Sequence, residues 1–260
     1  MKPYIYPYKL GSGSARNLAS VMNCKRIKPT PESTYVPRAS HLIINYGSSS
    51  MDIGHPATVL NKPVAVGLAT NKLKAFQTLR EYGVLVPEFT TSLEEAQSWE
   101  GKVVGRTKLQ GCGGEGISIY PEGEIDASIS TKLYTKYIKK TKEYRVHVFK
   151  KPDGTYSTDR IQVKKLTRST DVIELFTHEI RNHQNGWVFS SVFEREGDTW
   201  NQSIIDESIK ATKALGLDFC AVDVIWNRRK GVYVLEANTA PGLEGETLTS
   251  YKENFNLYLT

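Results

Sequence analysis

The chain has few cysteines, no long apolar run and no internal repeat, and these absences narrow the class of protein. Its three cysteines, Cys24, Cys112 and Cys220, are widely spaced in 260 residues. This argues against both a disulfide framework and a zinc site. No apolar run is long enough to span a membrane, and the first ten residues, MKPYIYPYKL, lack the apolar core of a signal peptide. We therefore expect a cytoplasmic protein without a membrane partner.

The composition that is present is ordinary for a globular enzyme. Hydrophobic residues make up 39% of the chain and charged residues 24%, and a chain of this length can bury a sizeable core in one domain or in two or three small ones. The net charge of +6 permits an anionic partner. A nucleotide site alone needs several basic residues, so this charge does not establish nucleic-acid binding.

The most informative segment, residues 221–244, reads AVDVIWNRRKGVYVLEANTAPGLE. Two apolar and β-branched runs flank the turn residues 228–230, which predicts a β-hairpin. If Arg228 pairs with Gly231, Asp223 lies opposite Glu236, and Asn238 shares the face of Glu236 because side chains alternate along a strand. Two carboxylates and an amide oxygen then converge, and such oxygen ligands suit Mg²⁺. The alternative is an exposed hairpin face whose acids are merely solvated.

The order of these residues resembles a known superfamily. EANTAPGLEG is similar to the metal loop of the ATP-grasp ligases, in which a Glu and an Asn bind Mg²⁺ before a Pro-Gly turn. The resemblance implies Asp223, Glu236 and Asn238 as ligands of Mg²⁺, with Mn²⁺ as an alternative, and ATP as the nucleotide. It implies an α/β (α+β) fold in which two α/β subdomains clasp ATP, preceded by a short pre-ATP-grasp region.

A glycine-rich loop, residues 109–116, joins two predicted strands at 102–108 and 117–120. A Walker loop would precede a helix and contain Gly-Lys-Ser or Gly-Lys-Thr, so this loop is not one. Between strands it could fold over nucleotide phosphates with its backbone N–H groups, or be a flexible hairpin turn. Upstream, HLIINY at residues 41–46 predicts a buried strand, and Asn71 predicts the start of a helix that ends at Gly83. Ser92, with Glu95 three residues later, predicts the start of a second helix.

This stretch resembles the beginning of the ATP-grasp fold in D-alanine–D-alanine ligases. There, a lysine at the start of a helix contacts ATP phosphate, and a strand lysine and a glycine-rich lid follow. Arg106 stands where the family has that strand lysine, and Lys108 is a nearby substitute. The resemblance implies nucleotide binding by Lys72, Arg106, Lys108, Gly113, Gly114 and Gly116.

Residues 133–149, LYTKYIKKTKEYRVHVF, predict a strand, a polar link and a second strand. By resemblance, this segment is the family hinge that holds adenine, although Thr135 and Lys136 lie where many members have a Glu. Lys164 and Lys165 lie in a further strand and point to opposite faces, so only one can contact terminal phosphate. The residues implied for adenine, ribose and phosphate are Lys136, Tyr137, Ile138, Glu143 and either Lys164 or Lys165.

The segment IRNHQNGWVF, residues 180–189, resembles the substrate-side loop of ribosomal-protein glutamate ligases. The resemblance implies that Arg181, Asn182 and His183 lie near the reacting carboxylate and that Arg145 points to phosphate or acyl substrate. A surface turn at Asn185-Gly186 is the alternative, and it accounts less well for three polar groups beside it.

The resemblance covers residues 67 to about 250 and implies a function. We expect an ATP-dependent carboxylate–amine ligase that forms an amide or peptide bond through an acyl phosphate. The alternatives are an ATP-grasp small-molecule kinase and a non-catalytic nucleotide- or polyanion-binding protein. The predicted domains are a reduced N-terminal domain at 1–66, a lid subdomain at 67–132 and a core subdomain at 133–260. The expected partners are a carboxylate donor and an amine acceptor, such as an amino acid, peptide or protein, with nucleic acid a weaker choice.

Overall fold

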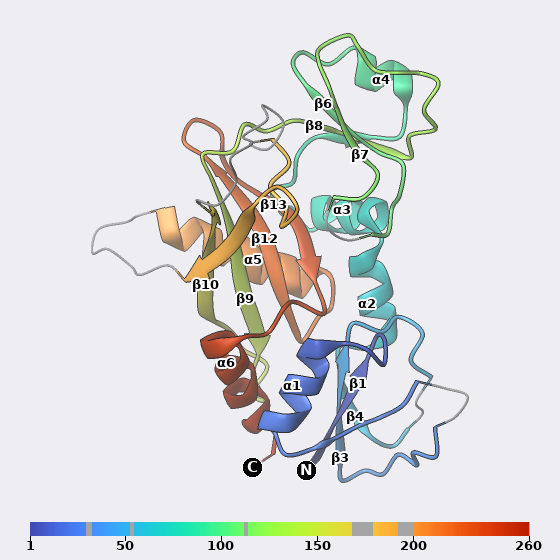
Figure 1. Ribbon diagram of the computed structural model, residues 1–260, viewed down its shortest axis with the longest axis vertical. Coiled ribbons are helices and arrows are strands. Elements are labelled where there is room, and N and C mark those ends of the chain that lie inside the picture. The colour runs from blue at the N-terminus through green and yellow to red at the C-terminus, as the bar shows by residue number, and fades with distance from the viewer. Residues whose placement is uncertain (30–32, 53–54, 112–113, 168–178, 192–199, 260) are drawn as a thin grey trace.

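The computed structural model describes residues 1–29, 33–52, 55–111, 114–167, 179–191 and 200–259 (Figure 1). Within these ranges the strands form three sheets with the orders β2-β1-β3-β4, β5-β8-β6-β7 and β11-β10-β9-β12-β13. The first sheet is parallel and the other two are antiparallel. Sheets and helices together confirm the mixed α/β (α+β) architecture.

The N-terminal sheet is built around β3, whose six residues HLIINY are all buried, as the apolar run predicted. Helix α1 connects β1 to β2, and the Ser12 side chain caps it by accepting a hydrogen bond from Ala15 N at 3.3 Å. The elements of this part are β1 (Lys2–Pro7), α1 (Gly13–Val21), β2 (Lys25–Arg26), β3 (His41–Tyr46), β4 (Thr58–Leu60) and α2 (Pro63–Thr70).

The second sheet carries the glycine-rich loop between β6 and β7. The predicted helix caps are present: Asn71 accepts from Lys74 N at 3.1 Å, and Ser92 accepts from Glu95 N at 3.2 Å. Strand β8 pairs with β5 and β6 in this sheet, so we place the proposed boundary between lid and core after Lys136. The elements are α3 (Lys72–Glu81), β5 (Phe89–Thr90), α4 (Leu93–Gln97), β6 (Val103–Arg106), β7 (Ile117–Tyr120) and β8 (Leu133–Lys136).

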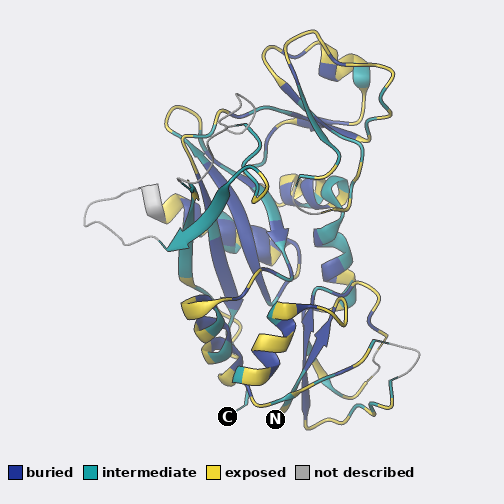
Figure 2. Ribbon diagram, in the orientation of Figure 1, coloured by how far each residue is buried: buried dark blue, intermediate teal, exposed yellow. Residues whose placement is uncertain are grey.

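The third sheet is the centre of the molecule, and its inner strands β9 and β12 are largely buried, whereas β10 and β11 are of intermediate exposure (Figure 2). One face packs against α2, α3 and α5, and the end near the N-terminal sheet packs against α1 and α6. The elements are β9 (Lys142–Lys150), β10 (Tyr156–Leu166), β11 (Trp187–Ser191), α5 (Trp200–Ala214), β12 (Phe219–Asn227), β13 (Gly231–Asn238) and α6 (Gly245–Asn256).

The β12–β13 hairpin brings Asp223 opposite Glu236 as predicted, but by a different register. Asn227, rather than Arg228, pairs with Gly231. The register then shifts, because Val224 pairs with Val234 while Asp223 pairs with Glu236. The extra residue, Leu235, is a bulge that restores the opposition of the two carboxylates, and bulges commonly re-aim side chains beside functional sites.

The polar face of β9 and β12 has an unusual pattern for a buried sheet. Along β9, Tyr144, Val146 and Val148 face the large apolar cluster. Because side chains alternate along a strand, Glu143 and Arg145 point to the opposite face.

No helix in the described ranges combines the length and apolarity that a membrane crossing requires.

Candidate active site

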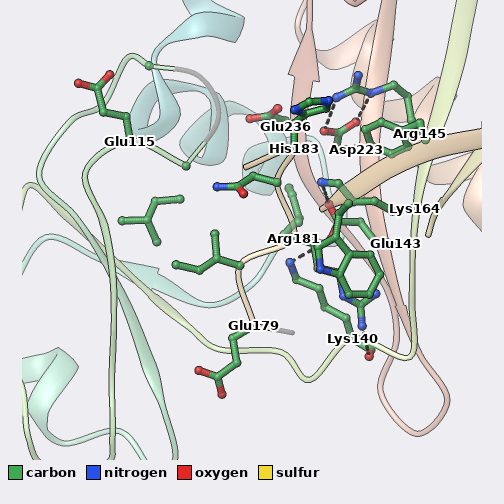
Figure 3. Close-up of a pocket in the computed structure, with 18 of the residues that line it drawn as sticks. Glu115, Lys140, Glu143, Arg145, Lys164, Glu179, Arg181, His183, Asp223 and Glu236 are labelled. Carbon is green, nitrogen blue, oxygen red and sulfur yellow. Dashed lines mark hydrogen bonds and ion pairs between the residues drawn. The ribbon is translucent and has the colours of Figure 1, made fainter. Parts of the chain in front are cut away.

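A pocket of about 650 Å³ lies between the lid sheet and the polar face of the central sheet (Figure 3). Its lid wall carries the apolar residues Val104, Ile117 and Ile119 beside Arg106, and Tyr137 and Leu235 add to the apolar lining. Its opposite wall carries charged side chains from β9, β10, β12 and β13. An apolar slot beside a few convergent polar groups is typical of a small-molecule site.

The two predicted metal-ligand carboxylates lie in this pocket, and each faces a cation. Arg145 donates from both Nε and Nη2 to Asp223, at 2.7 and 2.8 Å. Burial raises the pKa of the Asp223 carboxyl, and the Arg145 guanidinium opposes that rise. Lys72 forms an ion pair with Glu236 and lowers the pKa of that carboxyl to about 2. Glu236 is therefore ionised at neutral pH.

Asn238 is held differently. Its Oδ1 accepts a hydrogen bond from Ala240 N at 3.0 Å, and the residue is not among those that line the pocket. In the described ranges no group of three or more His, Cys, Asp or Glu side chains could hold a metal ion. Two opposed carboxylates with an amide oxygen on the same strand still fit Mg²⁺ when substrate phosphates supply further oxygens.

Glu143 is the centre of a buried ion cluster. It accepts hydrogen bonds from Lys140 at 3.0 Å and from Lys164 at 2.6 Å. Burial acts to raise the pKa of Glu143, but the two lysines together hold it below its ordinary value. The structure separates the two candidate lysines, because Lys164 lines the pocket while Lys165 is exposed on the other face of β10. The sequence prediction did not include Lys140, because it lies in the irregular link before β9, where no helix or strand period places its side chain.

The glycine-rich loop lies along the lid side of the pocket. Gly114 and Gly116 adopt φ angles of +87° and +73°, which favour glycine. Gly114 also leaves little space, since a Cβ there would lie 3.3 Å from Asn182 Nδ2. Lys108 forms an exposed ion pair with Glu115 across the loop. Gly113 lies outside the described residues.

Arg106 points into the pocket from β6. Its Nε is buried and has no hydrogen-bond partner. Burial lowers the pKa of this guanidinium and Glu236 opposes the shift. A buried donor without a partner is costly, so this atom is suited to an incoming anion.

The hinge residues are not all brought to the pocket. Tyr137 lines it, and Ile138 is buried beside it without forming part of the lining. Lys136 forms an ion pair with Glu88 at 2.6 Å and lies 5.4 Å from the ring centroid of Trp99. Its side chain is therefore occupied within the lid rather than in the pocket.

The turn before β11 closes the pocket on one side. Asn185 stabilises this turn through two local hydrogen bonds. Its N donates to Asn182 Oδ1 at 2.8 Å, and its Nδ2 donates to Ile180 O at 2.7 Å. Arg181, Asn182 and His183 all line the pocket. Arg181 lies over the Trp187 ring at 4.5 Å and donates to Lys140 O at 3.2 Å.

Sequence analysis missed the aromatic residues of β11. The Arg145 guanidinium lies 4.0 Å from the Phe189 ring centroid, and Lys164 Nζ lies 4.9 Å from it. The ring therefore helps to hold both cations on the polar face. The available signal was the alternation of Trp187 and Phe189 along one strand face.

A buried histidine links the pocket to α6. His147 Nε2 donates to Gln162 Oε1 at 3.0 Å, since an amide oxygen only accepts, and Nδ1 accepts from the Tyr251 hydroxyl at 3.0 Å. Burial lowers the pKa of His147 from 6.5 to about 4. Between pH 6.5 and about 4, His147 is therefore protonated in the unfolded chain but neutral in the folded protein.

We expect the free energy of unfolding to fall as the pH is lowered from 6.5 to about 4. In that window the unfolded chain binds a proton at His147 and the folded chain does not. Across the whole window this difference lowers the free energy of unfolding by about 3 kcal/mol. Urea unfolding at several pH values gives the free energy of unfolding at each pH. That free energy should depend less steeply on pH in His147→Gln than in the original chain. Equal slopes in the two proteins would contradict the assignment.

Comparison with known proteins agrees with this architecture. A family model described as RimK-like ATP-grasp domain matches residues 183–254. A probable alpha-L-glutamate ligase of Haemophilus influenzae is 46% identical over 65 residues, which cover 24% of this chain and 21% of that protein. A second from Pasteurella multocida is 44% identical over 68 residues, covering 25% and 21%. The chain thus spans about a fifth of the length of these curated relatives.

Solved structures match over nearly the whole chain. D-alanine–D-alanine ligase from Bacillus anthracis has a TM-score of 0.65 at 13% identity, covering 99% of this chain and 95% of that one. The ATP-grasp ligase PsnB, complexed with minimal precursor, has a TM-score of 0.68 at 10% identity, covering 99% of each chain. The molecule has the ATP-grasp fold. Its C-terminal part, which carries the β12–β13 hairpin, is similar to RimK-like ATP-grasp domains.

Proposed function

We propose that this chain is an ATP-dependent carboxylate–amine ligase that forms an amide or peptide bond. The observation that carries the proposal is the convergence of Asp223, Glu236, Arg145, Lys72 and Lys164 on one pocket whose lid wall carries apolar residues. Two opposed carboxylates amid cations suit a metal–triphosphate complex better than they suit an uncharged ligand. The ligase names of the similar proteins support the same conclusion.

In this proposal the nucleotide base lies against Tyr137 and the apolar residues of the lid wall, and the phosphates extend toward β13. Arg106, Lys72 and Lys164 bind the phosphates from different sides. Glu143, with Lys140, faces the ribose. Asp223, Glu236 and Asn238 would hold Mg²⁺, which supplies neutralisation of phosphate charge when it is bound.

The reaction needs two displacements. A carboxylate oxygen of the donor attacks the terminal phosphorus of ATP, the bond to the bridging oxygen breaks, and ADP leaves. The amine, once it has given up the proton of its ammonium form to solvent, attacks the acyl carbon through its nitrogen. The bond to the phosphate oxygen breaks, and the second proton that the nitrogen loses passes to the departing phosphate. Arg145 lines the pocket beside Asp223, and its positive charge would offset the charge that develops on the donor oxygens. Arg181 donates to Lys140 O and lies near Glu143, so it is on the ribose side of the pocket rather than beside the donor carboxylate.

The substrate classes follow from these side chains. A donor with a carboxylate, such as an amino acid or an acidic peptide, matches the positive charge of Arg145, and the acceptor is an amine. We keep the domain assignment as a proposal: an N-terminal domain at 1–66, a lid and a core. A cytoplasmic location remains a proposal that rests on the few, widely spaced cysteines.

The decisive experiment is an ADP-release screen over amino acids, acidic peptides and oligonucleotides, with mass spectrometry of the product. ADP release that requires both an acid and an amine, with a product lighter than the two substrates by one water, would establish ligation. A stable product that gains only a phosphoryl group would favour a kinase. Nucleotide binding without any turnover would favour the non-catalytic alternative.

The lid should become ordered over the phosphates. We expect amide hydrogen exchange in residues 114–117 to slow when an ATP analogue and Mg²⁺ are added, because little apolar packing holds this segment. Mass-spectrometric exchange measurements with and without the analogue test this, with the buried strand β3 as an unchanged internal control. Equal exchange in both conditions would count against a lid role.

A further inference from the structure

The carboxylates of the pocket are not equally partnered. Among the described residues six carboxylates line it, and five of them form ion pairs. The paired carboxylates are Glu115, Glu143, Glu179, Asp223 and Glu236. Glu244 is the sixth, and no cation from the described part of the chain neutralises it. Among the described carboxylates of the pocket, Glu244 is therefore the one that no ion pair occupies.

The segment that carries Glu244 is fixed from several sides. The Tyr46 hydroxyl donates to Pro241 O, and Leu243 N donates to Ser14 Oγ at 3.1 Å. The backbone of the N-terminal sheet approaches so closely that a Cβ on Gly47 would lie 2.6 Å from Ala240 Cβ. Leu243 is itself buried in the cluster formed with α1 and α6. Glu244 is therefore presented from a rigid support.

The Glu244 side chain is not used to cap the helix that follows. Its backbone carbonyl accepts from Thr247 N at 3.1 Å at the start of α6, but its carboxylate makes no cap hydrogen bond. The residue is exposed, and it lines the pocket together with Gly242 and Thr247. The carboxylate is available to a ligand.

Its place along the pocket is defined by β9. From Glu143 to Arg145 the strand advances about 7 Å away from the hinge, and the next residue on that face, His147, bonds Tyr251 of α6. Helix α6 lies beside α1, at the end of the central sheet remote from the lid strands (Figure 1). The order is hinge, then the Asp223 and Glu236 carboxylates, then Glu244.

We infer that Glu244 binds the ammonium group of the amine acceptor and so determines acceptor specificity. The inference rests on the proposed ligase function. Most amines reach the site protonated, and the other pocket carboxylates in the described residues are already neutralised by cations. A hydrogen-bonded carboxylate is the group that recognises an ammonium, and Glu244 lies beyond the phosphate-binding cations, on the side from which a nucleophile would meet the acyl group.

The test compares Glu244→Gln with Glu246→Gln. Glu246 is on the same helix start, but it pairs with Arg160 at 2.6 Å and does not line the pocket, so it is a matched control. The donors are L-amino acids and tri-L-glutamate, and each is offered an L-amino acid or hydroxylamine as nucleophile. Hydroxylamine is largely uncharged near neutral pH and traps acyl phosphate as a hydroxamate, so it needs no ammonium site.

We expect Glu244→Gln to raise KM for the amino-acid acceptor by about tenfold to a hundredfold, the value of a charged hydrogen bond. Hydroxamate formation and KM for ATP should be unchanged, and Glu244→Asp should restore part of the affinity. Unchanged KM for the acceptor would overturn the inference. Loss of both products at an unchanged melting temperature would also overturn it, because Glu244 would then serve the donor or the nucleotide. Absence of both products with the unaltered chain would instead refute the ligase function.

Discussion

Replacement of Glu236 by Ala should lower ATP turnover by at least a hundredfold to a thousandfold while the chain stays folded. Loss of a group that stabilises developing charge in the transition state typically has this size. Lys72 lowers the pKa of Glu236 to about 2, so the residue is a fixed negative charge at neutral pH. Its side chain is 34% exposed, so its removal should change the free energy of unfolding by only about 1 kcal/mol.

Two measurements check this expectation besides turnover. Mn²⁺ affinity in the presence of an ATP analogue should fall in Glu236→Ala, and the melting temperature should change little. Glu88→Ala is the matched control, because it also removes a glutamate paired with a lysine, Lys136, but outside the pocket. Full turnover in Glu236→Ala would refute the metal assignment.

Replacement of Arg145 by Met should destabilise the fold by about 3–5 kcal/mol and abolish turnover. The guanidinium forms two hydrogen bonds with Asp223, and the two side chains are only 15% and 8% exposed. Removing one partner of a buried ion pair leaves the other charge uncompensated, which is the source of the large cost. Asp223 should then take up a proton, since burial raises the pKa of its carboxyl.

Urea unfolding distinguishes this effect from a general loss of charge. Adding Asp223→Asn to Arg145→Met should recover a large part of the stability without recovering activity, because the uncompensated charge is gone but the site is not rebuilt. Arg229→Met removes an equivalent charge from the exposed hairpin turn and should be neutral within about 0.5 kcal/mol. Equal destabilisation by Arg145→Met and Arg229→Met would show that the buried pair contributes nothing.

The sequence by itself determined the local elements and several of the residues that line the pocket. Asn71 and Ser92 mark helix starts because their side chains can accept the first free amides, and both do so. HLIINY is apolar enough to be a buried strand and is one. The opposition of Asp223 and Glu236 was predicted from a pairing of Arg228 with Gly231 that is wrong, and it is present because the Leu235 bulge compensates for the shifted turn. A bulge has no reliable signature in one sequence, because it depends on the neighbouring strand.

The tertiary structure decided which polar side chains meet and which cation each carboxylate faces. Lys164 rather than Lys165 lines the pocket because β10 pairs with β9 in the register that sets Gln162 opposite Arg145, and Lys164 shares their face of the sheet. Lys136 and Arg145 are both basic residues in strands, yet one pairs with Glu88 in the lid and the other with Asp223 in the core. Such pairs join residues far apart in the chain, so they are determined by which strands become neighbours within a sheet and in which register.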